Sequence, residues 1–579
     1  MIIGAIAVGI ILLVITLKYI PQKEIRPSSK QIRLVVQPFE NLGPDEDEYF
    51  ADGITDEITS RLAGIHGLGV ISRTSAVQYK NSNKTIQKIG EELGIEYVLE
   101  GTVRWERPSE GPSRVRVTPQ LIRVSDDTHL WSDGYDVFLA DIFQVQSNIA
   151  EQVAQALDIT LLEPERRALA SRPTENMEAY EYYLRGNEYL HRGEGETDFR
   201  IVIRMHEKAV ELDPMFALAY TKLSRAHVAM YWMYYDRSDA RLAKVKQAID
   251  KAFELNPNLP EAHLALGWYY YQGHLDYDRA LEQFAITRKS QPNNSWLFTG
   301  IGAVQRRQGK FEQALANFKR ASELDPRSAT LAYYLGDTLM LLRKYPEAEL
   351  CYDRAISLAP HWPVPYSRKA SVYLLREGST KKARTILAEA LQNFKSAEEP
   401  FIVNSLVNID IFDGNYQEAL DRLSLKSEDI DSQFSFIPKA LRCAQISGYM
   451  NKKELEKKYY EEARSILESK IQEQPEDGRF HSALGIAYAG LGRKEDALRE
   501  GKLGVEMLPV TKEAWRGLYR VQTLAEIYVM VGEFDAAIDQ LEFLLSHPAW
   551  ISIPLLRLDP VWDPLRDHPR FKKLVDGRK

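Results

Sequence analysis

A period of 34 residues in the middle of this chain constrains its fold more than any other feature. Pro292, Pro326 and Pro360 are each separated by 34 residues. Small and aromatic residues recur at matching places in the two periods that these prolines delimit, namely Gly302 with Gly336, Ala314 with Ala348, Phe318 with Tyr352, and Ala321 with Ala355. A repeat of this length predicts an array of stacked units.

The repeated residues have a simple physical reading. Glycine and alanine let two antiparallel helices approach closely, an aromatic ring fills the space beside them, and proline ends the second helix because it has no N–H to donate. The pattern resembles the tetratricopeptide repeat (TPR), a helix–turn–helix unit of about 34 residues. One such unit cannot bury its apolar face alone, so neighbours must stack. An ordinary helical bundle with chance prolines is the alternative, and it is disfavoured because five or more units keep the register.

We expect this all-α TPR solenoid to cover residues 177–548 with about ten helix pairs. The register is stretched near residues 231–241, loosens after Pro360 and returns between Pro475 and Pro509. Residues 549–579 contain four further prolines. They are interpreted as a C-terminal cap over the last apolar face, which solenoids require.

The first 20 residues predict a transmembrane helix. Residues 1–20 carry no charge before Lys18 and hold roughly 17 apolar residues, which approach the thickness of a bilayer at about 1.5 Å per residue. The stretch lacks the basic start and small-residue cleavage site of a signal peptide. An uncleaved anchor is therefore preferred over a signal peptide or a buried helix. Residues 21–31 contain two prolines and are interpreted as a linker.

Residues 32–162 predict a small α/β domain, because strand-like and helix-like stretches alternate along them. The blocks VVQPFENL, EYFADGITDEI, ISRTSAVQYK, IGEELGIEYVLEGTVR and THLWSDGYD resemble the amino-terminal domain of TolB and its relatives. In a group of bacterial membrane proteins, such a domain follows a transmembrane helix and precedes TPRs. The C-terminal LLRLDPVWDPLRDHPRFKKLV resembles the usual ending of that group.

The resemblance also carries an expectation about what is absent. Many members of the group bear a cytoplasmic output domain before the membrane helix: a class III nucleotide cyclase, a winged-helix DNA-binding domain or a protein kinase. This chain begins at the predicted span. Two expectations stay open: a stand-alone anchored protein, or the sensory portion of a receptor-type cyclase or transcription regulator whose output domain is missing from this polypeptide.

Composition and motifs argue against several functions. A net charge of −8 and a pI near 5.9 disfavour a nucleic-acid binder, which needs a basic face. The two cysteines, Cys351 and Cys443, fit neither a disulfide framework nor a zinc site. The acidic run Asp45–Glu48 has no calcium-loop spacing, and Arg73-Thr74-Ser75 is interpreted as a structural turn. No catalytic signature is recognisable, so we expect no enzyme, no cofactor, no metal and no small-molecule substrate.

Aromatic and arginine residues on the first helix of several repeats predict a partner-binding groove, since such residues anchor protein interfaces. The register projects the following residues onto the concave face: Trp268, Tyr271, Trp296, Arg306, Arg307, Tyr333 and Asp337. The alternative is that many of these rings fill the packing between repeats.

These features together predict a membrane-anchored, non-catalytic scaffold or sensor that binds a protein or peptide partner in its concave groove. The group that it resembles places such a body in the periplasm, as part of a single-pass inner-membrane protein. The lysines and arginines that follow residues 1–20 instead favour a cytoplasmic body under the positive-inside rule. Both orientations stay open.

Overall fold

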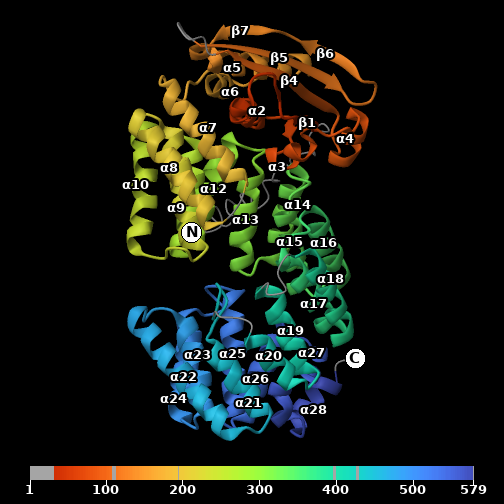
Figure 1. Cartoon of the computed structure of the whole chain (residues 1–579), viewed down its shortest axis with the longest axis vertical. Coiled ribbons are helices and arrows are strands. Elements are labelled where there is room, and N and C mark those ends of the chain that lie inside the picture. The colour runs from red at the N-terminus through yellow and green to blue at the C-terminus, as the bar shows by residue number, and fades with distance from the viewer. Residues whose placement is uncertain (1–30, 107–112, 193–194, 395–399, 425–428, 578–579) are drawn as a thin grey trace, which may run out of the picture.

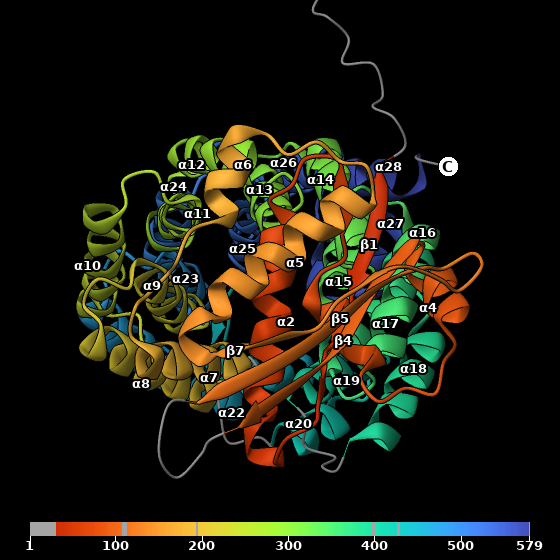
Figure 2. The same cartoon turned by 90° about the horizontal axis from the view of Figure 1, so that it is seen from above.

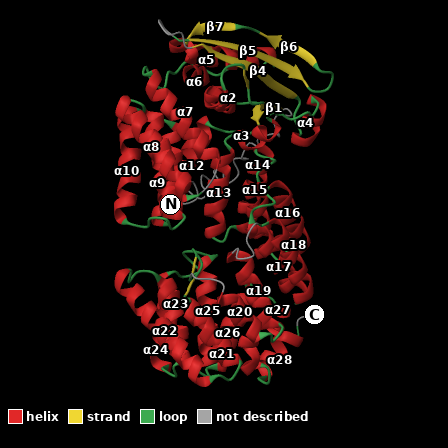
Figure 3. Ribbon diagram, in the orientation of Figure 1, coloured by secondary structure: helices red, strands yellow, loops and turns green. Residues whose placement is uncertain are grey.

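The computed structural model describes residues 31–106, 113–192, 195–394, 400–424 and 429–577. It contains an N-terminal α/β domain and a long helical solenoid (Figure 1). Strands are concentrated in the α/β domain at one end (Figure 3). None of the described helices is long and apolar enough to cross a membrane. The predicted transmembrane span and most of the linker after it lie outside the described residues.

The α/β domain is built on one mixed sheet. Its strands are β1 (Ile32–Val36), β2 (Glu40–Asn41), β3 (Leu68–Val70), β4 (Tyr97–Glu106), β5 (Arg114–Arg123), β6 (Thr128–Ser132) and β7 (Tyr135–Phe138). The order is β3-β1-β4-β5-β6, with β1 parallel to both β3 and β4, and with β4-β5 and β5-β6 antiparallel. Two short strands lie off this path: β2 pairs with β4, and β7 with β5. Strands β4 and β5 form a long antiparallel pair.

Helices cover both faces of the sheet. They are α2 (Glu48–Ala63), α3 (Arg73–Ala76), α4 (Ile86–Leu93), α5 (Ile142–Ala156) and α6 (Glu163–Leu169). Apolar residues of α2 and α5 share one core with the strands, and α4 packs on the other face through Ile89 and Leu93. Helix α4 ends at Gly94, whose φ of 65° suits glycine. Helix α2 lies between the sheet and the solenoid (Figure 1), and the view from above shows α5 crossing α2 (Figure 2).

The solenoid consists of ten antiparallel helix pairs within the described residues. They are α7 (Met177–Arg192) with α8 (Glu196–Leu212), α9 (Ala217–Trp232) with α10 (Asp239–Leu255), α11 (Pro260–Trp268) with α12 (Tyr277–Ser290), α13 (Ser295–Arg307) with α14 (Phe311–Leu324), α15 (Ala329–Leu341) with α16 (Tyr345–Leu358), α17 (Pro363–Glu377) with α18 (Thr380–Asn393), α19 (Pro400–Phe412) with α20 (Tyr416–Ser424), α21 (Lys439–Tyr449) with α22 (Lys453–Glu473), α23 (Gly478–Gly490) with α24 (Lys494–Met507), and α25 (Arg516–Met530) with α26 (Phe534–Ser546). Helix α11 continues as a π-helical turn, η4 (Tyr269–Gly273).

The glycine and aromatic positions of the repeat meet inside the third, fourth and fifth pairs, as their spacing predicts. A Cβ on Gly302 would lie 2.9 Å from the ring of Phe318, and one on Gly336 would lie 2.7 Å from Tyr352. In the first pair His206 takes the place of the aromatic ring and lies against Gly186. The close helix approach therefore depends on glycine at these places.

Two short segments complete the structure, one after the last helix pair and one between the seventh and eighth pairs. The C-terminal residues form α27 (Ile553–Leu558), η5 (Pro560–Leu565) and α28 (Pro569–Asp576). Trp562 and Phe571 of this segment share one core with α25 and α26, so the segment covers the last pair. Between α20 and α21 lies a small hairpin, β8 (Ile430–Asp431) and β9 (Phe436–Ile437).

The α/β domain is docked on the solenoid at several places, among them α7 and the end of α14. Helix α2 packs on α7, where a Cβ on Gly53 would lie 2.7 Å from the side chain of Leu184. The second contact lies at the end of α14, where the Ser75 hydroxyl donates to Asp325 Oδ1 at 2.5 Å. The N–H of Arg327 in turn donates to the Ser75 Oγ at 2.8 Å. Residues 73–75, interpreted from the sequence as a turn, are thus part of a short helix that holds two domains together.

Candidate interaction surface

The inner surface of the solenoid is formed by the first helix of each pair, and it carries the seven residues predicted to bind a partner. They lie on α11 and η4, on α13 and on α15. Five of them are buried, with exposed fractions of 6% for Trp268, 3% for Tyr271, 3% for Arg306, 1% for Arg307 and 0% for Asp337. The other two, Trp296 and Tyr333, are half-buried. Contacts within the chain account for most of this burial.

Arg307 is covered by a segment from the far end of the solenoid. Its Nη1 lies 3.1 Å from Glu513 Oε2, and its Nη2 donates to Gln433 Oε1 at 2.6 Å. The backbone is paired as well, since the N–H of Ala514 donates to the Arg307 carbonyl at 2.7 Å. Residues 513–515, which precede α25, therefore lie along the inner surface at α13.

The neighbouring Arg306 is held by aromatic rings. Its guanidinium lies 4.1 Å from the ring centroid of Trp515 and 5.2 Å from that of Tyr334. It also donates to the Tyr334 carbonyl at 3.3 Å. Burial lowers the pKa of Arg306, with Asp337 acting in the opposite direction. This arginine stabilises the packing of α13, α15 and the 513–515 segment on one another.

Asp337 is the centre of a second buried network. The hydroxyl of Tyr352 donates to its Oδ1 at 2.8 Å, and the Arg368 guanidinium lies 3.5 Å from the same oxygen. Burial and the Asp337 carboxylate raise the pKa of Tyr333 and Tyr352. Oδ1 of Asp337 is thus engaged within the chain, whereas its Oδ2 is buried without a hydrogen-bond partner among the described residues.

The first repeats present charged groups that remain partly exposed. Lys222 and Arg225 lie on α9, and both are half-buried. The Arg225 guanidinium lies 4.6 Å from the ring centroid of Trp296, which stacks on Trp268 at 4.3 Å. Glu261 of α11 accepts a hydrogen bond from Gln291. We refer to Lys222, Arg225, Glu261 and Trp296 as the charged inner surface.

Lys222 has no hydrogen bond or ion pair with any residue that the structure describes. Burial and the neighbouring Arg225 lower the pKa of its ammonium group, while Glu57, Asp56 and Glu261 raise it. Glu57 belongs to α2, so the α/β domain contributes charge to this part of the solenoid. Burial in turn raises the pKa of Glu57 and that of Glu261.

Lys222 and Arg225 were not among the residues predicted from the sequence, although the repeat register contains a signal for Arg225. Arg225 follows Ser224, which stands where Gly267 and Gly302 stand in the next two repeats. The residue after this small position is Trp268 in the third repeat, and that tryptophan was projected onto the concave face. Carrying the register one repeat further back would have identified Arg225.

The acidic run Asp45–Glu48 and the two cysteines were also considered from the sequence, and the structure shows their surroundings. Asp45–Asp47 form a short 3-10 turn that leads into α2, and Glu48 pairs with Lys80 at 2.5 Å. Across the described residues, no group of three or more His, Cys, Asp or Glu side chains is arranged to hold a metal ion. Cys351 and Cys443 are free thiols.

Comparison with known proteins supports the repeat assignment. The family model described as "Tetratricopeptide repeat" matches residues 299–362. The chain is 32% identical over 256 residues to a Rhizobium meliloti (strain 1021) protein named "Putative adenylate cyclase 3". This match covers 43% of this chain and 41% of that protein. It is 29% identical over 153 residues to anaphase-promoting complex subunit 3 of Schizosaccharomyces pombe, covering 26% of this chain and 22% of that protein. The chain thus spans less than half the length of these two curated relatives.

Among solved structures, the chain is similar to YrrB, which is described as a TPR protein with an unusual peptide-binding site. The identity is 19%, the match covers 35% of this chain and 95% of that one, and the TM-score is 0.26. The helix pairs and the family match together show that the chain contains tetratricopeptide repeats.

Proposed function

We propose that this TPR protein is a non-catalytic scaffold or sensor that binds a protein or peptide partner on the inner surface of its solenoid. The observation that carries the proposal is the charged inner surface. Lys222 has no partner there among the described residues, and Arg225 and Trp296 form a half-buried cation–π pair. A partner segment that bears a carboxylate and an apolar side chain could make two contacts here. The unpaired ammonium and the arginine would bind the carboxylate, and the tryptophan ring would pack against the apolar side chain.

The seven residues projected onto the groove from the sequence enter this proposal in two ways. Trp296 and Tyr333 are half-buried and able to contact a partner directly. The five others are buried by the chain itself, and we propose that they shape the surface on which the partner lies: Trp268, Tyr271, Arg306, Arg307 and Asp337. Binding through these residues remains a prediction.

Charge reversal tests the proposal. The full chain should capture partners from a bacterial extract, and the variant Lys222→Glu/Arg225→Glu should lose them. Its two new carboxylates replace two cations and repel a carboxylate-bearing partner. Lys244→Glu, on the outer helix α10, is the control for a change in net charge and should capture as the wild type does. Equal capture by the wild type and the double variant would place binding elsewhere.

A second candidate function is the sensory portion of a receptor-type nucleotide cyclase or membrane-bound regulator. The similarity to the Rhizobium meliloti protein and the TolB-like sequence blocks support it. Within the described residues there is the α/β domain and the solenoid, and no catalytic domain. An in-frame cyclase or winged-helix coding sequence upstream of Met1 would favour this function over a stand-alone scaffold.

We also propose that residues 1–20 tether the protein to the inner membrane, with the body in the periplasm. The apolar run and the resemblance support this placement, and a tether raises the local concentration of the protein for membrane-bound partners. Deletion of residues 1–20 should move the protein to the soluble fraction. Protease added to intact spheroplasts should cleave a periplasmic body and spare a cytoplasmic one.

A further inference from the structure

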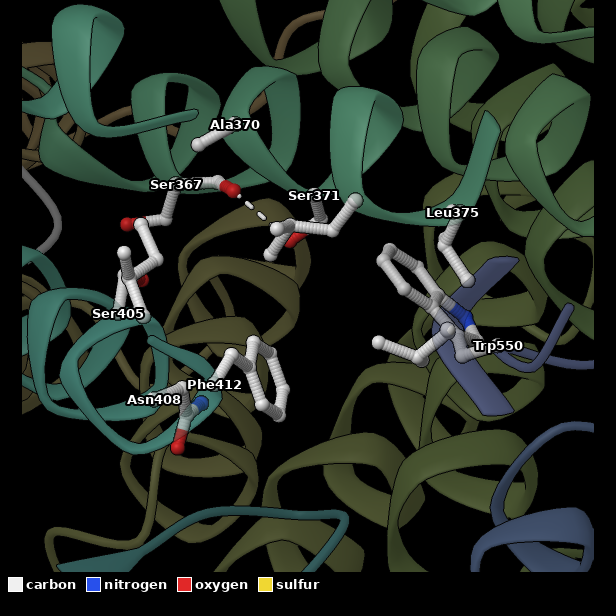
Figure 4. A pocket seen from close by; sticks show the side chains of 11 residues that line it. Ser367, Ala370, Ser371, Leu375, Ser405, Asn408, Phe412 and Trp550 are labelled. Atoms are coloured by element: carbon white, nitrogen blue, oxygen red, sulfur yellow. Dashed lines mark hydrogen bonds between the residues drawn. The ribbon is translucent and has the colours of Figure 1, made fainter. Parts of the chain in front are cut away.

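A cavity of about 140 Å³ lies on the inner side of α17 and α19 (Figure 4). It is far from the charged inner surface in sequence, and the residues that line it come from three places: α17, α19 and the C-terminal segment. Trp550 and Leu555 of that segment form one wall. The proposed scaffold function does not use this cavity.

The hollow arises because small residues occupy the helix faces that meet there. Ser367, Ala370 and Ser371 stand on one face of α17, three to four residues apart, and Ser405 faces them from α19. In the neighbouring α15, the residues at the places of Ser367 and Ser371 are Tyr333 and Asp337, in the register set by the 34-residue period. Serine side chains at these places leave the inner surface unfilled.

The Oγ atoms of the serines on the cavity wall are available to accept hydrogen bonds. Ser371 Oγ donates to the Ser367 carbonyl at 2.9 Å, and Ser405 Oγ donates to the Phe401 carbonyl at the same distance. Ser367 Oγ also donates to the Phe401 carbonyl, at 3.2 Å. Each hydroxyl hydrogen is therefore engaged with the backbone, and the oxygen lone pairs remain as acceptors.

The rest of the wall is apolar except for the Asn408 amide and the indole N–H of Trp550, which has no hydrogen-bond partner among the described residues. Phe412, Trp550 and Leu555 supply most of the opposite side. Asn408 Oδ1 accepts from Arg442, while its Nδ2 has no hydrogen bond with a described residue. Ligand sites of proteins commonly combine apolar walls with a few placed polar groups. This cavity has that composition at a small scale.

We propose that the cavity binds a small amphipathic molecule consisting of one six-membered ring and one hydroxyl or amino group. An enclosed apolar cavity of about 150 Å³ holds a benzene molecule, and this pocket, which is partly open to solvent, has about the same volume, so a ring of that size fits it. The ring packs between Phe412 and Trp550, and its donor group meets the serine oxygens. The volume admits a single ring and does not enclose a peptide segment as a whole. The bound molecule bridges α17 and α19 to the C-terminal segment.

Phenol and toluene, added separately to the purified full chain, test this assignment by calorimetry. Phenol should bind saturably with one site per chain, and toluene should bind at least tenfold more weakly because it lacks the donor. Ser371→Leu fills the cavity and should weaken phenol binding at least tenfold. Ser546→Leu is the matched control, since Ser546 also donates to a carbonyl of its own helix but is exposed on α26. Heats from phenol that do not saturate, or equal phenol binding by Ser371→Leu and the wild type, would overturn the proposal.

A second variant avoids any effect of Ser371→Leu on folding. Trp550→Phe keeps an aromatic ring in the wall. On phenol binding, the wild type should change its tryptophan emission, excited at 295 nm where phenol hardly absorbs. Trp550→Phe should lose this change while it retains the heat of binding. An emission change that persists in Trp550→Phe would place phenol beside another tryptophan and overturn the assignment.

Discussion

Arg307 and Glu513 form an ion pair although 206 residues separate them in the sequence. Their side chains are 2% and 0% exposed, and Nη1 lies 3.1 Å from Oε2. The pair joins α13, in the fourth helix pair, to the segment that precedes α25, in the tenth. The solenoid therefore closes on itself through its inner surface, and the inner surface at α13 is occupied by the chain's own residues.

Replacing one member of this pair should destabilise the fold strongly. Glu513→Ala leaves the buried guanidinium groups of Arg307 and Arg516 without their carboxylate, which typically costs about 3–5 kcal/mol. Urea unfolding measures the loss, and small-angle scattering should show a larger radius of gyration as the two ends separate. Glu533→Ala breaks the exposed pair with Lys494 and should cost about 1 kcal/mol or less. Similar losses in the two variants would contradict a closing role for Glu513.

A larger residue at Gly302 should separate a helix pair. A Cβ there would already lie 2.9 Å from the Phe318 ring and 3.2 Å from the Ala314 carbonyl oxygen, so Gly302→Leu should cost about 1–3 kcal/mol or more. Thermal unfolding followed by circular dichroism measures the effect. Gly134→Leu is the control, because a Cβ at Gly134 meets nothing within 4 Å. An unchanged melting curve for Gly302→Leu would show that the repeat register is wrong.

His206 should make the protein sensitive to acid. Burial lowers its pKa from 6.5 to about 3, and neither ring nitrogen has a hydrogen-bond partner. The unfolded chain therefore takes up the proton first, so stability is complete above pH 6.5 and falls by about 1.4 kcal/mol per pH unit below it, down to pH 3. His206→Phe, which introduces the kind of aromatic residue found at this place in the third, fourth and fifth pairs, should remove this loss. Its advantage over the wild type should grow by about 2 kcal/mol between pH 6.5 and pH 5 in urea titrations.

The reverse substitution in another repeat is a matched control for His206. Phe284 packs on Gly267 as His206 packs on Gly186. Phe284→His should therefore gain an acid-dependent loss of stability of the same sign. Parallel pH profiles for His206→Phe and the wild type would contradict the neutral, buried state of His206.

Glu526 should act in the opposite direction. Burial, followed by the neighbouring Asp559, raises its pKa from 4.5 to about 7. The folded state then holds its proton more tightly than the unfolded state, so this carboxyl group costs stability as the pH rises from 4.5 to 7 and continues to cost it above pH 7. Glu526→Gln removes the charge and should stabilise the protein by roughly 1–3 kcal/mol at pH 8, with little gain at pH 4.5. Urea unfolding at the two pH values measures the difference, and an equal effect at both would contradict it.

The local part of this fold was predictable, because the residues that define it lie close together in the sequence. Gly302 and Phe318 are 16 residues apart, and their contact repeats with the 34-residue period. The α/β domain could also be predicted, because strand and helix patterns alternate along residues 32–162.

The inner surface was less predictable. The register correctly placed Arg306 and Arg307 on α13, but nothing near them in the sequence indicates that Glu513 and Trp515 cover them. Such contacts depend on how the small rotation between successive repeats accumulates over several units. The same holds for Ser75 and Asp325, whose side chains meet only because the α/β domain lies on the fourth helix pair.

The closure between α13 and the segment before α25 has a consequence for synthesis of the chain. Once Arg307 has been added, the ribosome must add 206 more residues before Glu513 exists. At about 5–20 residues per second, this takes roughly 10–40 s. During that time the segment 513–515 does not yet cover the guanidinium and the aromatic groups around it. A chaperone or a neighbouring polypeptide that carries a carboxylate and an indole can bind these groups in its place.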